Sequence, residues 1–289
     1  MSASKQWPIR WDLLLRYRLI EIIALWEGRV TTNHLRDTFG IGRQQASKDI
    51  NTYRAQIGPG NLDYDKYLKG YKPAEHFEPQ VTSGVADEYL QLLSRNNELS
   101  DTFDSLPLSI TNTEILSVPV RNVKPKIIRA IVRAARERRR LEVDYVSVSS
   151  PTREGRIIVP HTLVFTSVRW HVRAWCEKNR EYRDFVLSRF RSDADMMDES
   201  EQGIEGDKDW NTMVTVKIKP DSRLSKAQQK VVAEDWGMTR NKLDVTVRGP
   251  LVQYALQALH SDSNTLQAKA EAQQIVISNL DDVKLWLFG

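Results

Sequence analysis

Residues 159–190 constrain the fold more than any other part of the chain, because they read as three short strands with two unlike faces. One face of the middle strand is apolar: Trp170, Val172 and Ala174. The other carries positive and aromatic groups: Arg169, His171, Arg173 and Trp175. The third strand is predicted to run on to Phe190 and to place Arg189 beside Phe185 and Leu187. Such cations can form a solvated face, but their aromatic neighbours and His161 favour a face that grips an anion.

Two earlier strands lead into this stretch. Residues 141–147 alternate in polarity, and residues 156–161 return with Ile157, Val159 and His161 on one face. About five strands in roughly 50 residues predict a small barrel-like sheet. The candidate effector-binding residues on it are Tyr145, Ser147, His161, Arg169, His171, Arg173 and Arg189, with Trp170 and Trp175 as packing or stacking aromatics.

The amino-acid sequence of these strands resembles a known family. A strand led by Pro160, a strand with the triplet Trp170-His171-Val172 and an ending Ser188-Arg189-Phe190 are similar to the WYL domain of bacterial transcriptional regulators. The Tyr and Leu of the naming triplet are replaced here. The run RWHVRAW looks like regulators that accompany BREX and related phage-defence operons. The resemblance implies an N-terminal winged helix-turn-helix, an SH3-like or Sm-like barrel, and a C-terminal extension that forms dimers.

The N-terminal residues predict a helix-turn-helix. A core helix over residues 12–26 can close at Gly28. Thr31 or Thr32 can cap a second helix, the turn Gly40-Ile41-Gly42 ends it, and a third helix begins near Arg43. The inward positions of this third helix are Ala46, Ile50, Tyr53 and Ile57. Its outer face offers side chains that pair with bases and phosphates: Arg43, Gln44, Gln45, Ser47 and Lys48. An ordinary helical hairpin is the alternative, but the glycine turn and the small Ala46 favour DNA binding.

A hairpin wing is predicted over residues 61–74, where Leu62 and Tyr64 alternate on one side of a short turn and Tyr67 and Tyr71 on the other. Lys66 and Lys69, with Lys72 beyond them, are candidate phosphate contacts. A solvated hairpin is the competing interpretation for each lysine.

The remaining segments complete an α+β multidomain chain. Residues 126–140 predict a helix whose arginine-rich end either docks on an acidic neighbour or phosphate, or complements the helix C-terminus. Residues 213–277 alternate strands and helices, ending in a hairpin over 265–277, which predicts a small α/β sandwich of the ferredoxin-like kind. The predicted parts are a winged helix-turn-helix (1–80), a connector (81–124), a WYL-like domain with its lead-in helix (125–205) and a C-terminal dimerisation domain (210–289).

Charge is distributed unevenly along the 289 residues. The net charge is only +4, but residues 120–191 hold eighteen Lys and Arg against seven acids, and residues 192–210 hold one against eight. A basic block beside an acidic one predicts a localised anion-binding surface and an acidic linker. The sequence has no long apolar run and no signal peptide, so we expect a cytoplasmic protein without membrane contact. A single cysteine, Cys176, excludes an internal disulfide and a cysteine-rich zinc site.

These features predict a homodimeric DNA-binding regulator, a repressor of a phage-defence operon. Its partners are a pseudo-palindromic double-stranded operator and an anionic effector, a nucleotide or nucleic acid, that releases it. An activator or an adaptor of a defence complex stays open. The alternative from another class is a nucleic-acid-processing enzyme with His161 and His171 as acid and base. The sequence contains no GxxxxGK, GxGxxG, HExxH or GxSxG motif, so we assign no catalytic residue, metal or cofactor.

Overall fold

The structure is a computed structural model of the 289-residue chain, and it describes residues 10–100, 116, 121–149, 151–259 and 267–287. The chain divides into two compact units, residues 1–117 and 118–289. Each is treated by itself below. Residues 101–115, predicted to belong to a connector, lie outside the described residues.

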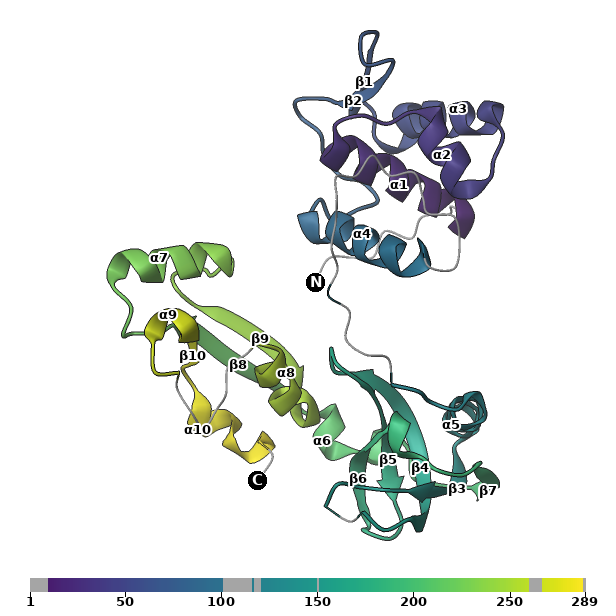
Figure 1. Ribbon diagram of the computed structural model, residues 1–289, viewed down its shortest axis with the longest axis vertical. Helices are drawn as coiled ribbons and strands as arrows, with labels where there is room; N and C mark the ends of the chain where they lie inside the picture. The colour runs from purple at the N-terminus through teal and green to yellow at the C-terminus, as the bar shows by residue number, and fades with distance from the viewer. Residues whose placement is uncertain (1–9, 101–115, 117–120, 150, 260–266, 288–289) are drawn as a thin grey trace. The chain divides into compact units, whose positions relative to one another are not determined.

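The first unit has the predicted helix-turn-helix and wing (Figure 1). Its elements are α1 (Trp11–Glu27), α2 (Thr32–Phe39), α3 (Arg43–Thr52), a π-helical turn η1 (Tyr53–Ile57), β1 (Leu62–Asp65), β2 (Gly70–Pro73) and α4 (Ala86–Ser100). Gly28 closes α1 in the left-handed conformation with φ 74°, as predicted. Thr31 caps α2 in a capping box with His34.

The core of this unit explains which face of α3 is left outside. Ala46, Ile50 and Tyr53 are at most 1% exposed and pack against α1 and Leu35 of α2. Because Ala46 is small, α3 can approach its neighbours closely. The polar residues of α3 other than the buried Asp49 therefore lie toward solvent. An isolated bridge between Val30 and Tyr71 attaches the wing to this core.

A buried carboxylate fixes the far end of the unit. Glu21 of α1 is fully buried and accepts a 2.8 Å hydrogen bond from the Tyr53 hydroxyl. It also accepts the backbone N–H groups of Gln80, Val81 and Thr82 and the Thr82 hydroxyl. Glu21 thus holds the end of α3 and the segment that leads to α4.

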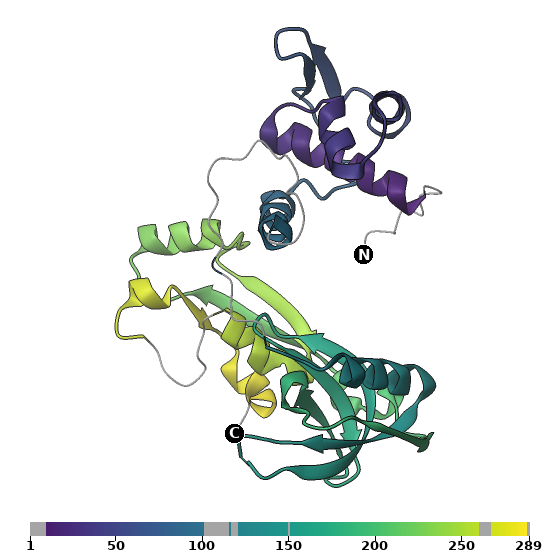
Figure 2. The same ribbon diagram turned by 45° about the vertical axis from the view of Figure 1, so that its right-hand side comes forward.

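The second unit begins with a five-stranded antiparallel sheet in the order β6-β5-β4-β3-β7. Its elements are α5 (Pro125–Glu137), β3 (Arg139–Tyr145), β4 (Glu154–Phe165), β5 (Trp170–Cys176), β6 (Glu181–Val186), a 3₁₀ turn η2 (Leu187–Arg189) and β7 (Asp195–Glu199). Ile127 and Ile131 of α5 pack on one face of this sheet. Figure 2 shows α5 lying against the sheet. Among the described residues β6 and β7 are edges, so no strand pair closes the predicted barrel.

Three expectations for this sheet are wrong. The helix predicted to reach Arg140 ends at Glu137, because Arg138 adopts a left-handed φ of 50° and Arg139 starts β3. The strand predicted to reach Phe190 ends at Val186, since the chain turns there so that Leu187 and Phe190 both enter the core. The acidic stretch 192–210 is no linker, because it supplies β7 to the sheet.

The chain then builds a smaller α/β layer. A 3₁₀ turn η3 (Ile204–Gly206) and α6 (Lys208–Asn211) precede β8 (Met213–Pro220), α7 (Lys226–Asp235), β9 (Leu243–Arg248), η4 (Gly249–Leu251), α8 (Val252–Ala258), α9 (Ala270–Gln273), β10 (Ile275–Ile277), α10 (Leu280–Val283) and η5 (Lys284–Trp286). The sheet order is β10-β8-β9, and α7, α8 and α10 bury its apolar face. The hairpin predicted over 265–277 is wrong: α9 fills part of it and β10 pairs with β8 instead.

Candidate functional sites

The outer side of α3 carries the candidate DNA-contacting surface, which we call the α3 surface. A shallow hollow there is lined by Arg43, Gln44, Ser47, Lys48, Asn51, Thr52, Ala55 and Gln56. Four of these, Arg43, Gln44, Ser47 and Lys48, are residues predicted from sequence. The side chains supply both donors and acceptors, which is the chemistry that base edges and phosphates require.

Gln45 lies differently from the other predicted residues. Its Nε2 donates a 2.7 Å hydrogen bond to Oδ1 of Asp49, one turn further along α3. It lines a separate hollow that also contains Arg10 and Tyr17. The structure therefore does not place Gln45 in the same hollow as Gln44.

Asn51 and Gln56 extend the α3 surface beyond the residues predicted to bind DNA. Asn51 follows Ser47 by one helical turn, so the spacing of the sequence could have identified it. Gln56 lies in the π-helical turn η1. A π-helical turn contains more residues than an α-helical turn, so it changes which residues continue the α3 surface. No local signal predicts that change.

The wing is fastened to the turn η1, which follows α3. The Arg54 guanidinium lies 4.8 Å from the centre of the Tyr71 ring, and its Nε donates to the Leu62 carbonyl at 3.3 Å. Lys66 and Lys69 lie in the turn between β1 and β2, and Lys69 has a left-handed φ of 49°. Lys66 stands over the Tyr67 ring, whereas Lys72 forms an ion pair with Asp65 at 3.6 Å.

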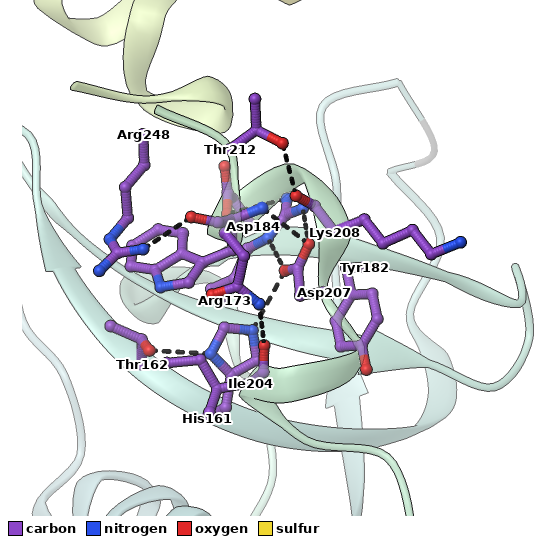
Figure 3. Close-up of polar contacts among 12 residues, drawn as sticks. His161, Thr162, Arg173, Tyr182, Asp184, Ile204, Asp207, Lys208, Thr212 and Arg248 are labelled. Atoms are coloured by element: carbon purple, nitrogen blue, oxygen red, sulfur yellow. Dashed lines mark hydrogen bonds and ion pairs between the residues drawn. The ribbon is translucent and has the colours of Figure 1, made fainter. Parts of the chain in front are cut away.

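In the second unit, the predicted effector residues fall into separate clusters. The first is the Asp207 cluster, shown in Figure 3. Arg173 donates to both carboxylate oxygens of Asp207, from Nε at 2.7 Å and from Nη2 at 3.2 Å, and lies 3.4 Å from Asp184. The Nε2 atom of His161 lies 3.2 Å from the same carboxylate. The anion that Arg173 grips is therefore part of its own chain.

Burial and charge decide the ionisation of this cluster. Burial opposes the charge of Asp207, but the hydrogen bonds from Arg173 and from the Trp210 N–H outweigh it and lower the pKa. Burial raises the pKa of Asp184, because its contact with Arg173 is longer. Burial also lowers the pKa of His161, although Asp207 opposes this. Asp207 and Arg173 form a buried charged pair that holds the sheet and the acidic segment together.

Asp207 also begins α6 and thereby reaches the C-terminal layer. Its Oδ1 accepts the Trp210 N–H at 3.0 Å. The Trp210 carbonyl in turn accepts a 2.7 Å hydrogen bond from Arg248 of β9. The prediction missed Asp207, since one aspartate in a run of acids has no pattern that distinguishes it.

The second cluster, the His171 cluster, lies near the start of β5. His171 is 1% exposed, and in the described part of the chain neither ring nitrogen has a hydrogen-bond partner. Burial and the charges of Arg169, Arg189 and Arg121 lower the pKa of His171 to about 4. The Tyr254 ring of α8 lies against the imidazole, with ring centres 5.1 Å apart. This is a buried polar group in a positive environment.

Other predicted residues serve packing or lie apart. Tyr145 is 6% exposed, contacts the Phe185 and Phe190 rings, and accepts the Val186 N–H at 3.0 Å through its hydroxyl. Ser147 lies beyond the end of β3, with its Oγ 3.1 Å from that of Ser149. Trp170 is half-exposed and contacts Phe165, and Trp175 packs on Tyr182.

Two further observations concern other kinds of site. The described residues contain no group of three or more His, Cys, Asp or Glu arranged to hold a metal ion. None of the described helices combines the length and the apolarity that a bilayer crossing needs.

Three family descriptions match successive parts of the chain. The winged helix-turn-helix domain of the BrxR transcriptional regulator matches residues 12–95, the WYL domain matches 126–194, and the C-terminal dimerization domain of the BrxR transcriptional regulator matches 213–283. A solved structure of the proteasome accessory factor PafBC of Arthrobacter aurescens aligns with 99% of this chain and 50% of its own, at 16% identity and a TM-score of 0.24.

Curated relatives match along nearly the whole length. The DNA-binding transcriptional repressor CapW of Pseudomonas aeruginosa is 32% identical over 283 residues, which is 95% of this chain and 92% of the relative. CapW of Stenotrophomonas maltophilia is 29% identical over 99% of this chain and 96% of its own. CapW of Escherichia coli is 31% identical over 95% and 91%. The chain belongs to this family of BrxR-like and CapW-like transcriptional regulators, with a winged helix, a WYL domain and a C-terminal dimerization domain.

Proposed function

We propose that two copies of this chain bind a pseudo-palindromic operator, repress a phage-defence operon, and release it when an anionic effector binds the WYL domain. The observation that carries the proposal is the α3 surface, where Arg43, Gln44, Ser47 and Lys48 line one hollow on an exposed helix. The relatives are named DNA-binding transcriptional repressors, which supports the same function.

Within this proposal the residues divide the work of binding DNA. Arg43 and Gln44 read base edges, and Ser47 and Lys48 contact bases or phosphate. Lys66 and Lys69 of the wing contact the backbone, which sets the register of the domain on the duplex. Gln45 contacts DNA from the edge of the α3 surface, since its amide already donates a hydrogen bond to Asp49.

The effector site centres on the His171 cluster. A buried imidazole without a hydrogen-bond partner costs about 1 to 3 kcal/mol, so it is an expensive residue to keep for packing alone. Nearby Arg169 and Arg189 make the site favourable for a phosphate or carboxylate group, to which His171 can donate a hydrogen bond. Tyr145, His161 and Arg173 support it from within the fold, and Ser147 extends it beyond the end of β3. A nucleotide or a short nucleic acid has the required chemistry.

A gel-shift experiment with the full chain tests both parts. Fragments from the region upstream of its own gene should be retarded, and a random fragment of equal length should not. Adding a nucleotide mixture or short oligonucleotides should release the specific fragment, and all strands should be recovered uncut. If no upstream fragment binds, the repressor proposal fails; if strands are cut, the protein is an enzyme.

Two substitutions test the effector site. Arg189→Ala should leave operator binding unchanged and abolish release, whereas Arg129→Ala, exposed on α5, should leave both unchanged. Arg173→Ala should instead destabilise the fold by about 3 to 5 kcal/mol, because it leaves the buried Asp207 carboxylate without its counter-ion. Normal release by the Arg189 variant would remove the His171 cluster from the proposal.

A further inference from the structure

Strand β9 has one open edge. Among the described strands, in the order β10-β8-β9, it pairs with β8 alone. The Gly249 N–H donates a 2.8 Å hydrogen bond to the Thr212 carbonyl. Because only every second residue of an antiparallel strand exchanges backbone hydrogen bonds with its partner, this bond shows which residues of β9 do so. Leu243, Val245 and Val247 therefore direct their backbone groups toward β8. The backbone groups of Asp244, Thr246 and Arg248 point away from it.

The opposite strand supports this assignment. Lys217 lies opposite Asp244. The Lys217 N–H donates to Asn279 Oδ1 at 2.8 Å, and its carbonyl accepts the Ser278 N–H at 2.7 Å. Both groups are thus used on the β10 side, and the pair with Asp244 has no backbone hydrogen bonds. Along the outer edge of β9, the described residues include no backbone partner for Asp244, Thr246 or Arg248.

This edge has neither a proline nor a bulge, two of the features that prevent strands from pairing between molecules. Its register with β8 runs from Leu243 to Arg248. By contrast, β10 at the other side is only three residues long and is followed by α10. An unpaired and regular edge is a template for another strand.

The sequence of β9 is complementary to itself about one residue. Asp244 lies two positions before Thr246, and Arg248 lies two positions after it. When two copies of β9 pair antiparallel around Thr246, each Asp244 faces Arg248 of the second copy, which is favourable. Centring the pair on Asp244 would oppose two carboxylates, and centring it on Arg248 would oppose two guanidinium groups. Only the register about Thr246 joins unlike charges and also matches the free backbone groups.

The other face of β9 is apolar. Leu243, Val245 and Val247 are only half-buried and pack on the core of the C-terminal layer. In the register about Thr246, Val245 faces Val247 of the second copy, which continues this apolar layer. Arg248 is already held by the Trp210 carbonyl and lies 4.9 Å from the centre of the Trp210 ring. Less side-chain entropy is therefore lost when it meets a carboxylate.

We propose that two copies of the chain join through β9, antiparallel about a two-fold axis at Thr246, so that the two C-terminal sheets become one. The proposal rests on the dimer of the proposed function and names its contact. The partner is a second copy because the edge is self-complementary, as a two-fold interface requires.

Cysteine cross-linking tests the register directly. In this arrangement the two Thr246 Cα atoms lie about 5.5 Å apart, within disulfide range. Thr246→Cys should therefore give a covalent dimer under mild oxidation, seen on a non-reducing gel. Asp244→Cys is the matched control: its two copies would lie roughly 14 Å apart and should stay uncross-linked. The native Cys176 is buried, so it should not interfere.

A second pair of variants tests the backbone contact. Thr246→Pro removes an outward N–H that its own chain does not use, so folding should survive. The dimer should weaken by roughly tenfold or more in sedimentation. Thr246→Val also loses the side-chain bond to Thr215 but keeps the N–H, so it should remain dimeric.

The outcomes separate this proposal from the one it rests on. If the wild-type chain is dimeric but Thr246→Cys does not cross-link and Thr246→Pro still dimerises, β9 is not the dimer contact. The proposed dimer itself would then remain valid. If the wild-type chain is monomeric at all concentrations, both proposals fall.

Discussion

His171 and Arg173 lie two residues apart on the same face of β5, yet their environments are opposite. Arg173 has two carboxylate partners, whereas His171 lies against the Tyr254 ring and is influenced by the positive charges of nearby arginines. Burial disfavours the protonated, charged form of an imidazole but not the neutral form. The positive charge of Arg173 is therefore neutralised by carboxylates, whereas burial and the neighbouring arginines keep the His171 imidazole neutral.

His171 should make stability depend on pH. Below its ordinary pKa near 6.5, the unfolded chain takes up a proton that folded His171 accepts only at about pH 4. The unfolded state then binds more protons, so the free energy of unfolding should fall as the pH decreases from about 6.5 to 4, by about 3 kcal/mol. His171→Phe should remove this part of the slope and raise stability at neutral pH. Denaturant unfolding at a series of pH values measures it, and an unchanged slope would contradict it.

Gln44 and Gln45 should differ despite being neighbours. Gln44→Ala should cost about 1 to 3 kcal/mol in discrimination between operator and random DNA, because its amide lies in the α3 surface. Gln45→Ala should cost less, since Asp49 already holds its amide. Lys48→Ala should weaken binding to all sequences and lower the salt slope by about one. Competition binding at several salt concentrations checks all three, and equal losses for the two glutamines would contradict the division.

At the scale of elements, Glu21 joins the end of α3 to the segment before α4. Glu21→Gln should lower stability by about 2 to 4 kcal/mol, because an amide group would face N–H donors at a fully buried position. Amide exchange should quicken most at Gln80, Val81 and Thr82. Glu75→Gln, at an exposed position nearby in sequence, is the control and should leave exchange unchanged. Protection unchanged in the Glu21 variant would show that the carboxylate is dispensable.

Local patterns predicted the elements that local physics determines. The spacing of Ala46, Ile50 and Tyr53, the glycine caps and the alternation of β3 to β5 identified helices, turns and strands correctly. Two of the misses, β7 and Asp207, depend on distant partners. β7 pairs with β3 across more than fifty residues of chain, and Asp207 meets Arg173 only after the sheet has formed. No periodicity in an acidic run reveals either contact.

At the scale of the whole molecule, the C-terminal layer is tied to the WYL sheet by named contacts. Arg173, Asp207, Trp210 and Arg248 form a continuous polar path from β5 to β9. Tyr254 of α8 lies against His171 beside it. An effector that enters the His171 cluster would therefore touch a side chain of the layer that carries β9.

The path through Asp207 also determines where the chain can be dissected. The segment that matches the WYL family ends at residue 194, before β7 and before Asp207. A fragment cut there would leave β3 with a bare edge and Arg173 with only the more distant Asp184 as counter-ion. The smallest piece that can fold by itself must reach at least to α6, so the unit that folds is longer than the unit that sequence families recognise.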